Sequence, residues 1–159
     1  MGHTARYDED FYAWTVDQAA RLREAASSGA NLPVDWENLA EEVESMGRSD
    51  RRALGNQLAR VLEHLLKLEH SPARLPRRGW KLSVVDGRRA AIDILNDSPS
   101  LRAKLDEILD PAWARGRKDA TGSLKTDTIS DDAVPADCPY TIGQILDEDW
   151  WPANRHGVA

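Results

Sequence analysis

Apolar residues recur at helical rather than strand spacing along most of the chain. The first stripe predicts a helix from about residue 8 to residue 26, because its members fall on one face at 3.6 residues per turn. Turn-forming residues then follow over 27–33 and predict the end of this helix. The members of the stripe are Tyr7, Phe11, Trp14, Leu22 and Ala25.

The next two stripes predict two helices that are separated at residues 47–49. Asp35 is suited to cap the first, and Gly47 is suited to end it, because glycine is common just after a helix. Ser49 is expected to cap the second, which ends before Pro72. We expect this second helix to form the centre of the core, because it carries the most regular stripe of the chain: Leu54, Leu58, Val61, Leu65 and Leu68.

Two further stripes predict helices over about residues 80–95 and 101–112. Ser98 is placed to cap the later helix, with Pro99 in its first turn, where the missing N–H costs nothing. Pro111 lies inside that later stripe and predicts either a kink or the start of another helix.

The C-terminal part of the chain shows weaker patterns. Residues 121–137 lack periodicity and predict an extended connection. Thr141 and Gln144 match a capping box, which predicts a short helix over residues 142–147.

Together these patterns predict an all-α fold, namely an antiparallel bundle of about five helices with an irregular C-terminal segment and a short terminal helix. We expect one domain over residues 1–159, with a core from about residue 7 to residue 152. No stretch approaches the ~20 apolar residues that cross a bilayer, so we expect no membrane partner.

Composition narrows the classes of function. The net charge of −6 disfavours a dedicated DNA-binding domain, so nucleic acid is not expected as the main partner. The single cysteine, Cys138, excludes a disulfide within the chain and a site of several cysteines. The N-terminal residues lack the pattern of a secretory signal, which predicts a cytoplasmic protein. No glycine-rich phosphate loop is present, and no cofactor is expected.

Charge is distributed unevenly along the chain. Residues 1–47 hold 3 basic and 10 acidic side chains, whereas residues 48–89 hold 11 basic and 4 acidic ones. One interpretation is that these are solvated helical surfaces of mixed charge. The alternative is a binding site for phosphates or an acidic partner at the basic stretch that contains Arg77, Arg78, Trp80 and Lys81.

Six separate motifs give the chain a family resemblance. The sequence resembles domain-of-unknown-function family 29 (DUF29), a family of bacterial proteins, over about residues 7–152. The resemblance implies a bacterial, mostly helical, soluble protein, and it carries no established reaction, cofactor or catalytic residue. The motifs lie at residues 7–14, 35–47, 64–67, 97–101, 138–141 and 146–152.

Three polar residues are candidates for a metal or acid–base site. Glu42 lies at the edge of an apolar stripe, and His64 flanks the leucine stripe of the following helix. If those two helices pack antiparallel, Glu42 and His64 meet, with Asp8 or Asp10 as the third member. The alternative is a structural pair in which the histidine is hydrogen-bonded to the carboxylate.

The adjacent Trp150 and Trp151 give an interaction signal, because two neighbouring tryptophans do not both point inward from a regular element. The first functional hypothesis is therefore a non-enzymatic interaction or regulatory module, with a protein partner or a second copy. The alternative is a metal-binding or hydrolytic bundle that uses the Glu42, His64 and Asp10 group. A weaker alternative is nucleic-acid contact through the basic stretch.

Overall fold

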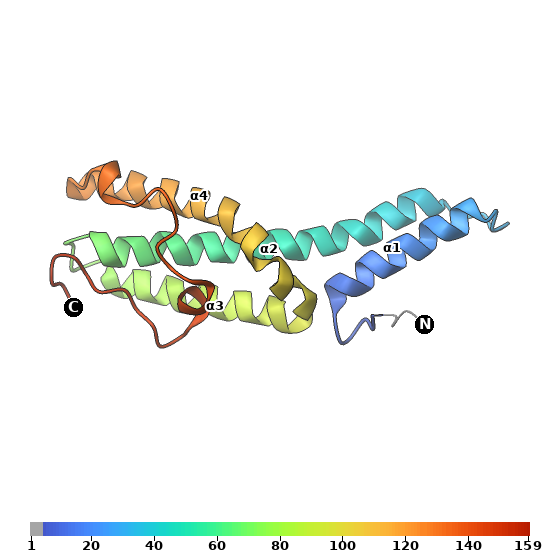
Figure 1. Ribbon diagram of the computed structural model, residues 1–159, viewed down its shortest axis with the longest axis horizontal. Coiled ribbons are helices and arrows are strands. Elements are labelled where there is room, and N and C mark those ends of the chain that lie inside the picture. Colours follow the sequence, from blue (N-terminus) through green and yellow to red (C-terminus); the bar gives the residue numbers. More distant parts are fainter. Residues whose placement is uncertain (1–4) are drawn as a thin grey trace. The chain divides into compact units, whose positions relative to one another are not determined.

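The computed structural model describes residues 5–159 and confirms the all-α fold, with no strand in that range. Between the helices lie short 3-10 turns, of which η1 (Pro99–Lys104) directly precedes a longer helix. Figure 1 shows the order of the elements. The α-helices are α1 (Phe11–Ser27), α2 (Trp36–His70), α3 (Arg77–Asp97), α4 (Leu105–Leu124) and α5 (Ile142–Leu146).

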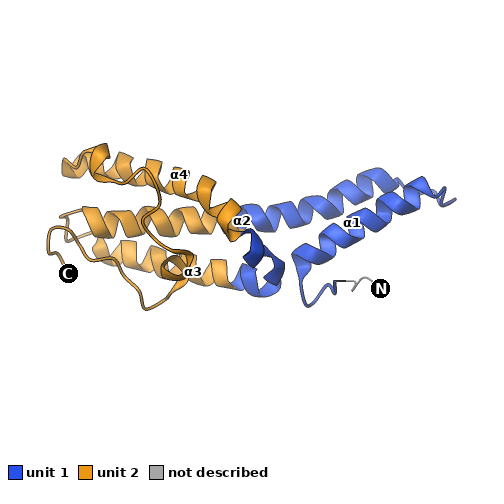
Figure 2. Cartoon of the chain, in the orientation of Figure 1, with its two compact units in different colours: residues 1–53, 93–104 blue, residues 54–92, 105–159 orange. Residues whose placement is uncertain are grey.

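The chain divides into two compact units (Figure 2). Unit 1 comprises residues 1–53 and 93–104, and unit 2 comprises residues 54–92 and 105–159. Helix α2 is continuous and contributes to both. No helix in the described part of the chain is both long and apolar enough to cross a membrane.

The prediction of two helices separated at residues 47–49 was wrong, because α2 runs without a break for 35 residues. Gly47 does not end a helix. It is buried, and a Cβ at this position would overlap the Thr15 Oγ1 atom of α1. The glycine is therefore explained by the close approach of two helices, which a single sequence does not distinguish from a helix end.

In unit 1, α1 and the first part of α2 form an antiparallel hairpin (Figure 1). Helix α1 begins later than predicted because Asp10 is its cap and accepts a hydrogen bond from Ala13 N at 2.9 Å. The Asp10 carboxylate also accepts from Ser100 N at 2.7 Å and thereby joins η1 to α1. Arg23 pairs with Glu44 at 2.7 Å across the hairpin, and this hydrogen bond lowers the pKa of Glu44.

In unit 2, the leucine stripe of α2 forms the core, as predicted. Leu58, Leu62 and Leu65 are fully buried. Two glycines let neighbouring helices approach α2 closely. A Cβ on Gly87 of α3 would lie 2.8 Å from a methyl group of Val61, and one on Gly116 of α4 would lie 2.7 Å from the carbonyl oxygen of Ala59.

The predictions for the later elements were partly correct. Residues 99–104 form a 3-10 turn before α4, and Pro111 lies inside α4 without starting a new helix. The region predicted as extended from residue 121 instead continues α4 to Leu124 and then forms two further 3-10 turns. The capping box is confirmed, because Thr141 Oγ1 accepts from Gln144 N at 3.1 Å and Gln144 Oε1 accepts from Thr141 N at 3.0 Å.

Gly116→Ala is expected to lower the free energy of unfolding by about 1–3 kcal/mol, because the added methyl group meets backbone rather than a movable side chain. Gly122→Ala in the same helix is the control. Nothing lies within 4 Å of its Cβ position, so it should raise stability by about 0.5–1 kcal/mol. Urea denaturation measures both, and stabilisation by Gly116→Ala would contradict the close packing of α4 on α2.

Candidate functional site

Within unit 2, a buried arginine holds the C-terminal segment against α3. Arg88 of α3 has no exposed surface. Its Nε donates to Ile145 O at 2.8 Å, and its Nη2 donates to Gln144 O at 3.0 Å and to Trp150 O at 2.9 Å. Burial lowers the pKa of Arg88. Because these three acceptors are backbone carbonyls, Arg88 fixes the path of the chain around and after α5.

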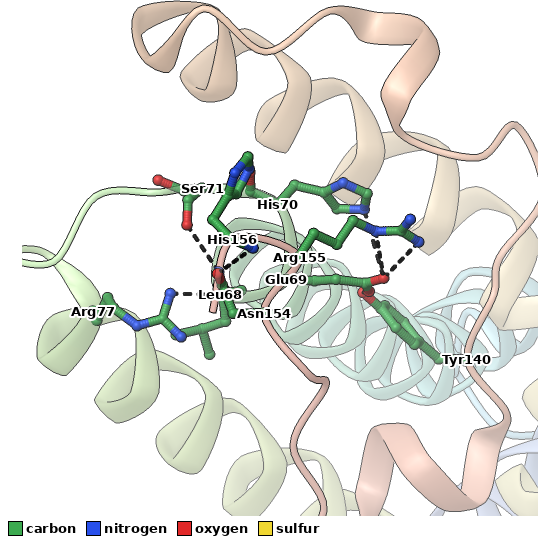
Figure 3. Close-up of polar contacts among 9 residues, drawn as sticks. All are labelled: Leu68, Glu69, His70, Ser71, Arg77, Tyr140, Asn154, Arg155 and His156. Atoms are coloured by element: carbon green, nitrogen blue, oxygen red, sulfur yellow. Dashed lines mark hydrogen bonds and ion pairs between the residues drawn. The ribbon is translucent and has the colours of Figure 1, made fainter. Parts of the chain in front are cut away.

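The end of α2 is a second anchor for this segment (Figure 3). The Glu69 carboxylate accepts from the Tyr140 hydroxyl, and its Oε1 atom accepts from Arg155 Nη2 at 2.9 Å. The backbone contributes as well, since Arg155 N donates to Glu69 O at 2.9 Å. Burial and the neighbouring Glu69 carboxylate raise the pKa of Tyr140, which keeps its hydroxyl a donor.

The carbonyl groups that any helix leaves unpaired at its C-terminal end are satisfied here by distant residues (Figure 3). Asn154 Nδ2 donates to Leu68 O at 2.7 Å and to Ser71 O at 2.9 Å. Arg77 Nη1 also donates to Leu68 O, at 3.1 Å, and Arg77 Nε donates to the backbone oxygen of Ala159 at 3.2 Å. The C-terminal segment therefore caps the C-terminal end of α2.

His70 is a buried titratable group within this anchor. Its Nε2 atom has no hydrogen-bond partner and lies 3.9 Å from Glu69 Oε1. Its backbone oxygen lies 2.9 Å from a ring nitrogen of His156. Burial is the largest cause of a lowered pKa at His70, and Arg155 and His156 add to it against the opposing effect of Glu69.

Beside the C-terminal segment lies a groove of about 430 Å³, which we call the basic groove. Among the described residues that line it, none has a carboxylate side chain. A neighbouring pocket of about 250 Å³ shares Arg77, Lys81 and Ala159 with it and is also lined by Trp151. The basic groove is lined by Arg74, Arg77, Arg78, Lys81, Leu82, Val85 and Ala159.

The structure brings together three of the four residues predicted in the basic stretch, namely Arg77, Arg78 and Lys81. Trp80 does not line the basic groove. It lines another pocket, of about 280 Å³, together with Lys67 and other residues. The basic groove therefore lacks the aromatic side chain that was expected to stack a nucleic-acid base.

The two adjacent tryptophans have different surroundings. The Trp150 ring lies 5.5 Å from that of Tyr140, edge to face. The Trp151 ring lies 5.0 Å from the Arg88 guanidinium carbon, in cation–π geometry. Both side chains are half-buried and help to hold the C-terminal segment.

The structure does not support a common site for Glu42, His64 and Asp10. The prediction required two antiparallel helices, but Glu42 and His64 both lie on the single continuous helix α2. A ring nitrogen of His64 lies 2.8 Å from Arg60 O, one turn earlier. In the described part of the chain, no three side chains of the metal-binding types gather as ligands.

Sequence reasoning missed Arg88, although the pattern contains a signal for it. Arg88 follows Val84 by four positions and precedes Ala91 by three, so it occupies the buried face of α3. A charged residue on an apolar stripe indicates a buried polar contact. By contrast, no local pattern predicts that Glu69 meets Arg155 or that Asn154 meets Leu68 at the end of α2.

The family model described as "Domain of unknown function DUF29" matches residues 6–151. The chain belongs to the DUF29 family. No curated protein matches it. A solved structure, an alpha-helical protein of unknown function from Rhodospirillum rubrum, is similar at 25% identity with a TM-score of 0.77, over 93% of each chain.

In this DUF29 chain, Arg88→Met is expected to lower the free energy of unfolding by about 3 kcal/mol or more, because three carbonyl groups lose a charged donor. Arg88→Lys should not restore it, because one ammonium cannot replace the planar fork. Urea denaturation gives the stability, and limited proteolysis reports release of residues 147–159. Arg89→Met is the matched control, because Arg89 is exposed. Equal effects at the two positions would contradict the assigned role of Arg88.

The lowered pKa of His70 predicts a pH dependence of stability. As the pH falls below about 6.5, the unfolded chain binds a proton before the folded chain does, so stability decreases. In His70→Gln and His70→Leu, the free energy of unfolding should fall less between about pH 7 and pH 5 than it does in the wild type. Chemical denaturation across that range measures it, and an unchanged slope in both variants would contradict the account.

Proposed function

We propose that this protein is a non-enzymatic interaction module whose basic groove binds an acidic, partly apolar segment of a protein partner. The observation that carries the proposal is the composition of the groove. Four cationic side chains line it together with Leu82 and Val85, and Leu82 is 55% exposed. A segment with carboxylates and small apolar anchors matches both features.

The geometry of α3 supports this reading. Arg78, Lys81, Leu82 and Val85 follow the i, i+3, i+4, i+7 spacing of one helix face, so they present a continuous surface. Arg77 is largely buried and donates hydrogen bonds to Leu68 O and to the backbone oxygen of Ala159. Its main role is therefore to position the edge of the groove. Arg78 and Lys81 are exposed and are the cations assigned to the partner.

A cytoplasmic location belongs to the same proposal. It is supported by the free thiol of Cys138, which is half-buried and whose pKa is raised by burial. Such a thiol suits a reducing compartment.

The test uses a fluorescently labelled synthetic peptide with Glu and Leu residues. Each residue type recurs every three or four positions, as on one face of a helix. Fluorescence anisotropy should show saturable binding that weakens as salt is raised, because exposed ion pairs are screened. Arg78→Glu with Lys81→Glu should raise the Kd at least about tenfold, or about 1.4 kcal/mol. The matched control is Arg60→Glu with Lys118→Glu, which changes the charge equally at exposed positions outside the groove.

Equal loss of binding in both double variants would show an effect of net charge alone and would overturn the proposal. A single-stranded oligonucleotide is the comparison probe. If it bound more tightly than the peptide and depended on Arg78 and Lys81, the basic groove would be a nucleic-acid site instead.

A further inference from the structure

The hairpin of unit 1 exposes apolar side chains along one stripe of α2. Leu39 and Met46 are 43% and 46% exposed, and Val43 between them is half-buried. Their spacing of four and three residues places them on one face of the helix. The buried face of the same segment contains Ala40 and Gly47. The exposed stripe therefore borders the face that packs on α1.

Carboxylates accompany this stripe. Glu42 follows Leu39 by three positions, precedes Met46 by four and is exposed. Asp50 follows Met46 by four positions, so it continues the stripe into a pocket of about 290 Å³. We call this surface the acidic face. It comprises Leu39, Glu42, Val43, Met46 and the residues that line the pocket, which are Tyr7, Asp8, Phe11, Asp50 and Asp97.

The pocket at the end of the acidic face suits a cation. Burial raises the pKa of Asp50, the Asp97 charge adds to the shift, and a hydrogen bond with Ser98 opposes it. A cationic group placed there would relieve this repulsion. The rings of Tyr7 and Phe11, edge to face at 5.6 Å, add a second feature that attracts cations.

The same chain carries a surface of complementary chemistry. The basic groove presents Arg78 and Lys81 beside Leu82 and Val85 at the spacing by which a helix docks on an apolar stripe. Residues 1–47 have an excess of seven acidic side chains, and residues 48–89 have an excess of seven basic ones. The acidic face and the basic groove therefore match in charge sign and in having an apolar centre.

We propose that the acidic face of one copy binds the basic groove of a second copy, so that the protein assembles with itself. This inference rests on the proposed function of the groove and names the partner that supplies the acidic segment. Leu39 and Met46 pack on Leu82 and Val85, while the carboxylates pair with Arg78 and Lys81. The contact is heterologous, because two different surfaces meet.

Sedimentation velocity of the full chain tests the proposal across protein concentration and salt. The wild type should self-associate at low salt and dissociate as salt is raised. Glu42→Arg with Asp97→Arg reverses the charge of two of the four carboxylates on the acidic face, and a cation at Asp97, the last residue of α3, also suits a helix C-terminus. Arg78→Glu with Lys81→Glu reverses the charge of the two exposed groove cations that are assigned to the partner. Each variant alone should raise the dissociation constant at least about tenfold.

A mixture of the two reversed variants is the decisive arm. Each variant then offers the surface that the other needs, so association should return to near the wild-type strength, while Arg60→Glu with Lys118→Glu should associate as the wild type does. Circular dichroism confirms that each variant is folded. A wild type that stays monomeric at low salt would overturn the proposal, and so would association that either reversal leaves unchanged or that the mixture does not restore.

These outcomes are separable from those of the proposed function. If the acidic peptide binds the basic groove and the wild type stays monomeric, the groove has a foreign partner and only the self-assembly is wrong. If the wild type associates through other surfaces and the peptide does not bind, both are wrong.

Discussion

The interaction on which the candidate site depends is the set of hydrogen bonds from the buried Arg88 guanidinium to three backbone carbonyl groups. Taking a guanidinium out of water is costly, and the cost is offset only if charged hydrogen bonds of good geometry replace the lost water. Side chains of the segment could vary without loss of these bonds. The arrangement thus fixes the path of the chain around α5 and Trp150, while separate hydrogen bonds hold Asn154 at the end of α2 and Ala159 at Arg77.

Much of the fold could be predicted from periodicity, because a helix that buries one face must repeat its apolar residues every three or four positions. The stripe that contains Leu58 and Leu65 therefore identified the core helix correctly. The error at Gly47 has a physical origin. Glycine ends helices, but it also permits close helix contact, and only the position of Thr15 on another helix distinguishes the two roles.

Less of the candidate site could be predicted. The cations Arg78 and Lys81 are close in sequence on one helix, so their proximity follows from local structure. The contacts of Glu69 with Tyr140 and Arg155 join residues about 70 to 90 positions apart, and no local pattern encodes such meetings. The prediction that Glu42 and His64 meet rested on the same assumption as the predicted helix boundary. Both assumed a turn at a point where α2 continues.

The proposed function requires that the basic groove recognises an acidic segment. The most direct measurement is a titration of the isotope-labelled full chain with the acidic peptide, followed by amide chemical shifts in NMR spectra. The account predicts that the largest shifts lie at residues 74–85 and 151–159, the two segments that line the groove and its neighbouring pocket. Saturable binding whose largest shifts lie on α1 or α4, or the absence of shifts at low salt, would contradict it.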